Sequence, residues 1–241
     1  MKKISKNLFK WSTVLATALL CTSGAQAAKW SSTKVEVLYG FDYKRGANFA
    51  EDDQAILTVA NATGFSWGDS YFFLDTSNVD NDDATGGTHM EFGPRLRFWK
   101  GDGAVKAMYG IAQIDWDSGK FANKVTKMAG FSLDWNVPGF KFVKTHVQYR
   151  DDPTLDGNSV QFNLVWNKGF KIGEQNFSFE GFADWTSSEG RSESNLLTQP
   201  VLMWHPSKNL GLGVEYQYWK NRIGIKGLDE KAPQIIGRWT F

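Results

Sequence analysis

The sequence has little of what usually holds an exported protein or a helical membrane protein together. Its 241 residues include one cysteine, Cys21, and only 6 prolines. No apolar run after residue 27 reaches the roughly 18 residues that a membrane-spanning helix needs, so a helical membrane protein is excluded. The 27 basic residues nearly balance the 26 acidic ones, which gives no support to a nucleic-acid polymer as partner. The 15% share of aromatic residues argues against a disordered chain.

The first 27 residues have the three parts of a secretory signal. A basic start is followed by a short apolar stretch and by the small-residue site Ala25-Gln26-Ala27. The alternative is a short buried helix. We expect a signal peptide over 1–27 and one domain over 28–241. Cleavage would remove Cys21, so the exported domain would contain no disulfide.

Beyond residue 27 the dominant period is two, which is typical of strands with one apolar and one polar face. Val35, Val37 and Tyr39, for example, alternate with Lys34 and Glu36. No segment has a convincing helical period. The pattern predicts twelve strands, near residues 33–41, 53–62, 69–77, 88–99, 104–115, 124–136, 140–150, 159–167, 175–186, 194–204, 210–220 and 232–241.

The connections between these segments alternate in length. Long polar connections are expected at 42–52, 78–87, 116–123, 151–158, 187–193 and 221–231. The connections between them are generally shorter, and this alternation is typical of outer-membrane barrels, which have long outer loops and short periplasmic turns. An even number of strands brings both termini to the periplasmic side.

Periodicity alone does not separate a membrane barrel from a soluble one, because both alternate apolar and polar residues. Strand lengths of roughly nine to eleven residues match a tilted membrane strand. The chain ends on Trp239-Thr240-Phe241, which looks like the ending that outer-membrane barrels present to their assembly machinery. Aromatic residues near strand ends suit interfacial girdles: Phe41, Trp67, Trp99, Trp116, Trp135, Trp166, Trp185, Trp204, Trp219 and Trp239. We therefore predict an all-β, antiparallel transmembrane barrel of about 12 strands, in contact with lipid in the bacterial outer membrane.

The segment Met90-Glu91-Phe92-Gly93-Pro94-Arg95 resembles the Met-Glu-x-x-Pro-Arg segment of the Tsx/OmpK family of nucleoside-specific outer-membrane channels. The segments 68–75, 130–135 and 179–185 are similar to aromatic strands of that family, so the likeness covers most of residues 30–241. The resemblance implies a monomeric twelve-stranded barrel, nucleoside uptake and, in some members, use as a phage receptor.

Charged residues of both signs share the inward parity of the predicted strands. Such a lumen suits a neutral or zwitterionic solute. The alternative is that the charges pair across the barrel and fill it. The charged candidates for the lumen are Asp75, Glu91, Arg95, Glu180, Asp184, Glu215 and Arg238.

Three aromatic residues, Tyr71, Phe73 and Phe182, share that inward parity. Aromatic rings in a polar lumen are unusual, and a nucleobase can stack on them. The nearby Asp75 and Asp184 can accept hydrogen bonds from ribose hydroxyls. A strand parity shifted by one residue would instead turn Tyr71 and Phe73 toward lipid.

These residues predict a passive channel for nucleosides or similar small polar solutes. One alternative is a closed barrel that acts through its outer loops as a receptor, for phage for example. The other is a barrel enzyme, for which only His89 is placed to serve as a base, beside Ser77 or Thr88. The histidines show no metal spacing, and Asp80, Asp82 and Asp83 lack the remaining features of a calcium loop. We expect no catalytic residue, no metal and no cofactor.

Overall fold

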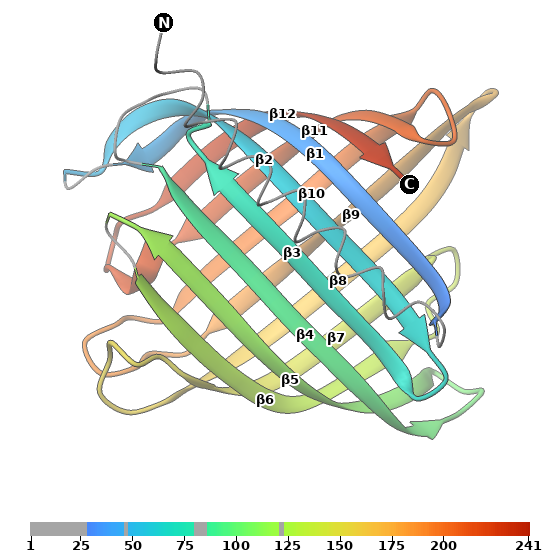
Figure 1. Cartoon of the computed structure of the whole chain (residues 1–241), viewed down its shortest axis with the longest axis horizontal. Coiled ribbons are helices and arrows are strands. Elements are labelled where there is room, and N and C mark those ends of the chain that lie inside the picture. The colour runs from blue at the N-terminus through green and yellow to red at the C-terminus, as the bar shows by residue number, and fades with distance from the viewer. Residues whose placement is uncertain (1–27, 46–47, 80–85, 121–122) are drawn as a thin grey trace, which may run out of the picture.

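The computed structural model describes residues 28–45, 48–79, 86–120 and 123–241. The predicted signal over 1–27 and the loop residues Asp80, Asp82 and Asp83 lie outside these ranges. The described chain forms twelve strands (Figure 1): β1 Ala28–Arg45, β2 Ala50–Phe65, β3 Gly68–Ser77, β4 Gly87–Lys100, β5 Val105–Gly119, β6 Asn123–Trp135, β7 Phe142–Asp151, β8 Ser159–Ile172, β9 Gln175–Thr186, β10 Asn195–His205, β11 Leu210–Lys220 and β12 Glu230–Thr240.

Each strand pairs in antiparallel fashion with the next one along the chain. The last strand, β12, pairs with β1 from Lys34↔Thr240 to Gly40↔Gln234, so the sheet closes into a barrel. Closure leaves no sheet edge exposed to hydrocarbon. The prediction of an antiparallel twelve-stranded barrel is thus confirmed. Within the described ranges, no helix has the length and apolar character to cross a membrane.

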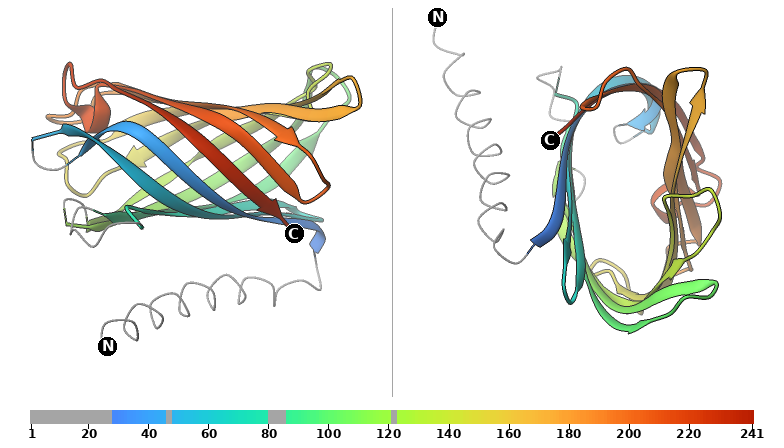
Figure 2. Two further views of the ribbon diagram at one scale, coloured as in Figure 1. Left: turned by 90° about the horizontal axis from the view of Figure 1, so that it is seen from above. Right: turned by 90° about the vertical axis from the view of Figure 1, so that its right-hand side faces the viewer.

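The barrel is flattened, as the end-on view in Figure 2 shows. Its two described chain ends meet at one end of the barrel, where the Phe241 N–H donates a hydrogen bond to the Thr33 carbonyl oxygen over 2.9 Å. This is the end that carries the short turns 66–67, 101–104, 136–141, 173–174 and 206–209. We refer to it as the periplasmic end.

Two connections expected to be long, 42–52 and 116–123, are shorter than predicted, because the strands on either side continue beyond the apolar pattern. The ladder of β1 and β2 extends to the pair Arg45↔Ala50 and is supported by an ion pair between Lys44 and Glu51, with 2.6 Å from Nζ to Oε1. The strands β5 and β6 likewise remain paired up to Ser118↔Asn123. We refer to the opposite end of the barrel as the outer end. Its longer connections are 78–86, 152–158, 187–194 and 221–229.

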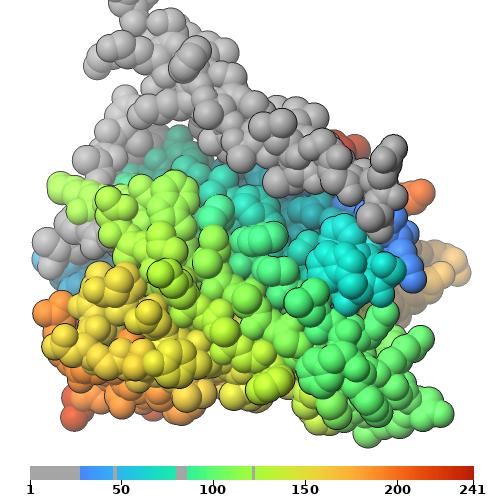
Figure 3. Space-filling model, turned by 60° about the horizontal axis from the view of Figure 1, so that its bottom comes forward, coloured from blue at the N-terminus to red at the C-terminus, as the bar shows by residue number. Residues whose placement is uncertain are grey.

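The two faces of the wall differ as a membrane barrel requires. Large apolar side chains stand exposed on the outer face, including Val37, Leu96 and Phe131, and Figure 3 shows the closely packed outer surface over β4 to β8. Polar side chains such as Gln148 and Ser132 are fully buried on the inner face. One predicted girdle residue is wrong: Trp219 lies directly opposite Glu230, and therefore on the inner side of the wall.

Close approach between β6 and β7 requires a glycine at position 130. A Cβ there would lie 2.0 Å from the Val147 carbonyl oxygen, whereas a Cβ on Gly110 would meet nothing within 4 Å. We predict that Gly130→Ala destabilises the folded barrel by about 1–3 kcal/mol, as overpacking does elsewhere. Urea unfolding followed by tryptophan fluorescence measures this, with Gly110→Ala as the control. Equal midpoints for the two variants would contradict the prediction.

Candidate functional site in the barrel lumen

All ten residues predicted for the lumen lie on the inner side of the wall. Directly opposed residues of antiparallel strands share a face, and Tyr71, Phe73 and Asp75 oppose Ala62, Ala60 and Thr58. Ala60 and Thr58 are buried, so β3 turns these three side chains into the barrel. The remaining seven share that face through the register of β4, β9, β11 and β12: Glu91, Arg95, Glu180, Phe182, Asp184, Glu215 and Arg238.

Arg95 is the centre of the first inner cluster, near the periplasmic end. Its Nε and Nη2 donate to the two carboxylate oxygens of Asp69 over 2.7 and 2.5 Å. Its Nη1 donates to Ser132 Oγ and to Asp134 Oδ1, both over 2.7 Å. The guanidinium also lies 4.1 Å from the centre of the Tyr109 ring. Arg95 is therefore held by β3, β5 and β6 together and is not free to bind solute.

Arg238 is the centre of the second cluster. It donates to Glu36 on β1 and to Glu180 on β9, although β11 and β10 separate β12 from β9 in the wall. Lys34 Nζ lies 3.8 Å from Glu180 Oε1, and Asn167 donates to the other oxygen of Glu180 over 2.5 Å. These contacts pass across the lumen and narrow it near the periplasmic end.

Two glycines of β11 lie beside this cluster. Gly211 lies opposite Arg238, and a Cβ at Gly211 would lie 3.6 Å from the Cβ of Arg238 and 3.1 Å from Cγ of Met203. A Cβ at Gly213 would lie 2.4 Å from the Leu202 carbonyl oxygen. The bare backbone of β11 thus leaves room for the Met203 side chain beside Arg238.

The third group, midway along the barrel, is dominated by carboxylates. Asp75, Glu91, Asp184 and Glu215 were predicted for the lumen, and the register adds Asp115, directly opposite Glu91. Amide side chains hold several of them: Gln113 Nε2 donates to Glu91 Oε2 over 3.1 Å and to Asp115 Oδ1 over 2.9 Å. His89 bridges Asp117 and Glu91, at 2.7 and 3.2 Å.

The aromatic candidates stand on opposite walls. Tyr71 and Phe73 lie on β3 and Phe182 on β9, which are six strands apart around the ring in either direction. The rings of Tyr71 and Phe73 are 6.0 Å apart. Tyr71 faces inward yet keeps 48% of its surface exposed, so the lumen is open beside it.

Sequence reasoning missed several inner residues. Asp69, Asp134, Asp115 and Gln113 carry the same alternating polar signal as their neighbours, so that signal was available. An apolar inner patch gave no such signal, because Leu38 falls on the polar parity of its strand. This patch consists of Leu38, Ile56, Val201, Met203 and Ile236.

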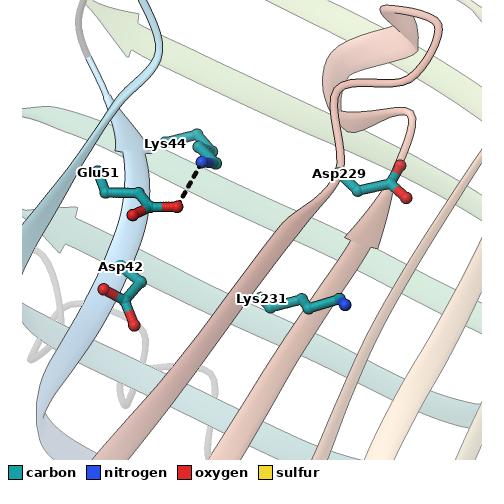
Figure 4. A pocket seen from close by; sticks show the side chains of 5 residues that line it. All are labelled: Asp42, Lys44, Glu51, Asp229 and Lys231. Atoms are coloured by element: carbon teal, nitrogen blue, oxygen red, sulfur yellow. Dashed lines mark hydrogen bonds and ion pairs between the residues drawn. The ribbon is translucent and has the colours of Figure 1, made fainter.

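A separate polar pocket of about 410 Å³ lies near the outer end of the barrel wall (Figure 4). It is lined by Asp42, Lys44, Glu51, Asp229 and Lys231, from the β1–β2 hairpin and the chain on both sides of the start of β12. No predicted lumen candidate lines it. Lys231 lies opposite Tyr218 and alternates with the buried Glu230 and Ala232, so the pocket belongs to the outer face of the wall and not to the lumen.

A buried network fixes the outer connection 152–158 to the connection 187–194. Glu189 accepts hydrogen bonds from Ser159 Oγ over 2.6 Å and from the Asp152 backbone N–H over 3.2 Å. Burial alone would raise the pKa of Asp152, but hydrogen bonds from Lys124 and Thr154 outweigh it and lower the pKa to about 2. The ionised form of Asp152 thus stabilises the folded state.

The depressed pKa of Asp152 sets the sign of a pH effect. Its contribution is present above the ordinary carboxyl pKa of 3.8 and disappears as the pH falls through about 2. We predict that Asp152→Asn lowers the urea midpoint most above pH 4, and that the difference from the unmodified protein closes toward pH 2. Asp151→Asn, at an exposed neighbouring position, is the control. A difference independent of pH would contradict the assignment.

The crossing ion pair predicts a change in conductance. Replacing both partners, Arg238→Ala with Glu180→Ala, removes two long side chains from the narrowed part of the lumen without leaving a lone charge from the pair. We expect a larger single-channel conductance in a planar bilayer. Lys127→Ala, at an exposed residue opposite the outward-facing Ile114, is the control. An unchanged conductance would mean that the narrowest passage lies elsewhere.

Comparison with known proteins agrees with this architecture. A family model described as nucleoside-specific channel-forming protein, Tsx, matches residues 25–235. No curated protein matches the sequence. Among solved structures, the NanC porin has a TM-score of 0.52 at 11% identity, covering 86% of this chain and 98% of that chain. The KdgM porin has a TM-score of 0.49 at 11% identity, covering 86% and 99%.

The likeness to NanC, at such low identity, concerns the barrel fold alone. The family match extends over most of the chain, and its members are channel-forming proteins rather than enzymes. With the closed barrel and its polar lumen, it makes this protein a channel of the bacterial outer membrane. The chain belongs to the family of nucleoside-specific channel-forming proteins, Tsx.

Proposed function

We propose that the channel admits nucleosides passively, and that the aromatic rings of the lumen guide the base. The observation that carries this proposal is the pair of opposed walls, with Tyr71 and Phe73 on β3 and Phe182 on β9. A planar base between these walls can stack on a ring at either side. Each such stacking contact contributes about 1–3 kcal/mol and tolerates different bases.

Hydrogen-bond acceptors stand beside these rings. Phe73 lies directly opposite Glu91, while Asp75 and Asp184 lie two residues from Phe73 and Phe182. A ribose presents hydroxyl donors, which carboxylate oxygens accept. A sugar without a base would meet the acceptors but lose the stacking, so the two contacts together favour nucleosides over sugars of similar size.

The inner apolar patch extends the surface available to a base. Ile56 lies on β2, which is next to β3 in the wall, and Leu38 lies opposite Ile56 on β1. Ile236 lies opposite Leu38 on β12. Apolar side chains thus line part of the wall beside the strand that carries Tyr71. This supports a path along the wall formed by β12, β1, β2 and β3.

The proposal includes the route to the membrane. Residues 1–27 act as the export signal, and the assembly machinery recognises the strand that ends in Phe241. The narrowing by Arg238 and Glu180 favours one alternative, a closed barrel that serves as a receptor through its outer loops, for phage among other ligands. Conductance distinguishes the two functions.

The proposed function is tested by single-channel recording of refolded residues 28–241. We expect a small conductance that adenosine or thymidine blocks saturably, while sugars of similar size do not. Block by both classes alike would contradict nucleoside preference. Absence of conductance from protein that a heat-modifiable gel shift reports as folded would favour the closed receptor.

Substitution of the rings tests their role. Tyr71→Ala and Phe73→Ala should each weaken nucleoside block by roughly 5- to 150-fold, the equivalent of about 1–3 kcal/mol. Tyr149→Ala, at an outward-facing residue with 55% exposure, is the matched control and should leave block unchanged. Equal block by all three variants would remove the rings from the site.

A further inference from the structure

The charge inside the barrel is unevenly distributed along its axis. In the cluster around Arg95, two cations, Arg95 and Lys144, face two carboxylates, Asp69 and Asp134. In the cluster around Arg238, Arg238 and Lys34 face Glu36 and Glu180. Each cluster near the periplasmic end is therefore electrically balanced.

The middle of the lumen has no such balance. We define the acidic zone as Asp75, Glu91, Asp115, Asp184 and Glu215, contributed by β3, β4, β5, β9 and β11. Among the described residues, no lysine or arginine lies within 4.0 Å of these carboxylates, and only His89 pairs with one of them, Glu91. His89 is shared with a further carboxylate, Asp117. Even with His89 protonated, negative charge is in excess.

Two carboxylates of the zone stand side by side. Glu91 and Asp115 lie directly opposite each other on β4 and β5, and Gln113 Nε2 donates to both. Like charges that lie this close are held together by their neighbours rather than by mutual attraction. A mobile positive charge between them would relieve the repulsion.

The amide side chains around the zone also favour a positively charged solute. Asn163 Nδ2 donates to Asp184 over 2.7 Å, and Gln234 Nε2 donates to Glu215 over 2.8 Å. Their oxygens, Asn163 Oδ1 and Gln234 Oε1, are buried and have no hydrogen-bond partner, and the same holds for Gln148 Oε1. Asn163 is 7% exposed, Gln234 2% and Gln148 0%.

The orientation of these amides has a consequence for the solute. Because their N–H groups face the carboxylates or another amide, these three amides leave only their acceptor oxygens unsatisfied. Buried acceptors without a donor are costly. Within the described residues the zone thus combines carboxylates that have no lysine or arginine partner with unpaired amide oxygens, and an ammonium ion or a hydrated alkali cation supplies both positive charge and donors to them.

We propose that the acidic zone makes the channel selective for monovalent cations, both alkali ions and small primary ammonium ions. Rings of carboxylates produce cation selectivity in other pores. The zone is diffuse rather than a chelating site, and no group of three or more His, Cys, Asp or Glu side chains in the described ranges has the arrangement to hold a metal ion. The inference goes beyond the proposed nucleoside uptake and requires only an open lumen.

The test is the reversal potential of the channel across a tenfold KCl gradient at neutral pH. The unmodified protein should give a potential of the sign expected for K⁺ over Cl⁻, toward the limit of about 59 mV that a tenfold ratio sets for a single charge. A potential near zero, or one of the opposite sign, would overturn the proposal without any variant being needed.

Substitutions test whether the acidic zone is the cause of the cation selectivity. Asp75→Asn, Asp115→Asn, Asp184→Asn and Glu215→Gln together should bring the potential close to zero while the channel still conducts. If the fourfold variant fails to refold, Asp184→Asn alone replaces it, and we expect this variant to lower the potential part of the way. The control is Asp102→Asn with Glu174→Gln, in exposed periplasmic turns, and should leave the potential unchanged. Full selectivity retained by Asp184→Asn and the fourfold variant would overturn the assignment.

The outcome for the proposed function is separate. A cation-selective channel that nucleosides do not block would contradict the proposal of nucleoside uptake and support the present inference. A channel that nucleosides block but that does not distinguish K⁺ from Cl⁻ would do the reverse. Folded protein that never conducts would overturn both.

Discussion

The pairing of β1 with β12 is the constraint on which the rest of the molecule depends. In hydrocarbon no water is available for an unpaired backbone group, so a sheet is stable there only when its two edges meet. Seven residue pairs, Lys34↔Thr240 through Gly40↔Gln234, make that junction. Once the ring is closed, its register decides for every residue whether it meets lipid or lumen, because the side-chain period is two.

Closure also explains why charge is handled differently in different parts of the lumen. Near the periplasmic end, arginine and carboxylate side chains satisfy one another, and the lumen is occupied by protein there. In the middle, amides take the place of cations as partners for the carboxylates, and the space beside Tyr71 remains open.

Much of the fold follows from the sequence, because a strict period of two is a strong local signal. Twelve strands and their order along the chain follow from that period. The parity at Tyr71 does not, because Phe72 is apolar as well, and it is the small buried Ala60 opposite Phe73 that resolves it. The girdle prediction fails for Trp219 because it rests on nearness to a strand end, although Trp219 shares the polar parity of Glu215 and Gln217.

The partners of the lumen residues were out of reach for a similar reason. Arg95 was recognisable as inward-facing, but its contacts Asp69 and Asp134 lie on other strands, 26 and 39 residues away. Only the register brings them together. The apolar inner patch was missed because alternation predicts polarity on that face, and residues such as Met203 depart from it where the wall is packed against a glycine.

The bare backbone of Gly211 and Gly213 has a consequence for how such a channel diversifies. At this level the free width is set by the length of one side chain beside β11, not by the number of strands. A single codon change at the arginine resets that width, while the ladder and the lipid-facing residues stay as they are. Descendants of one barrel can thus acquire passages of different bore without any change in how they insert into the membrane.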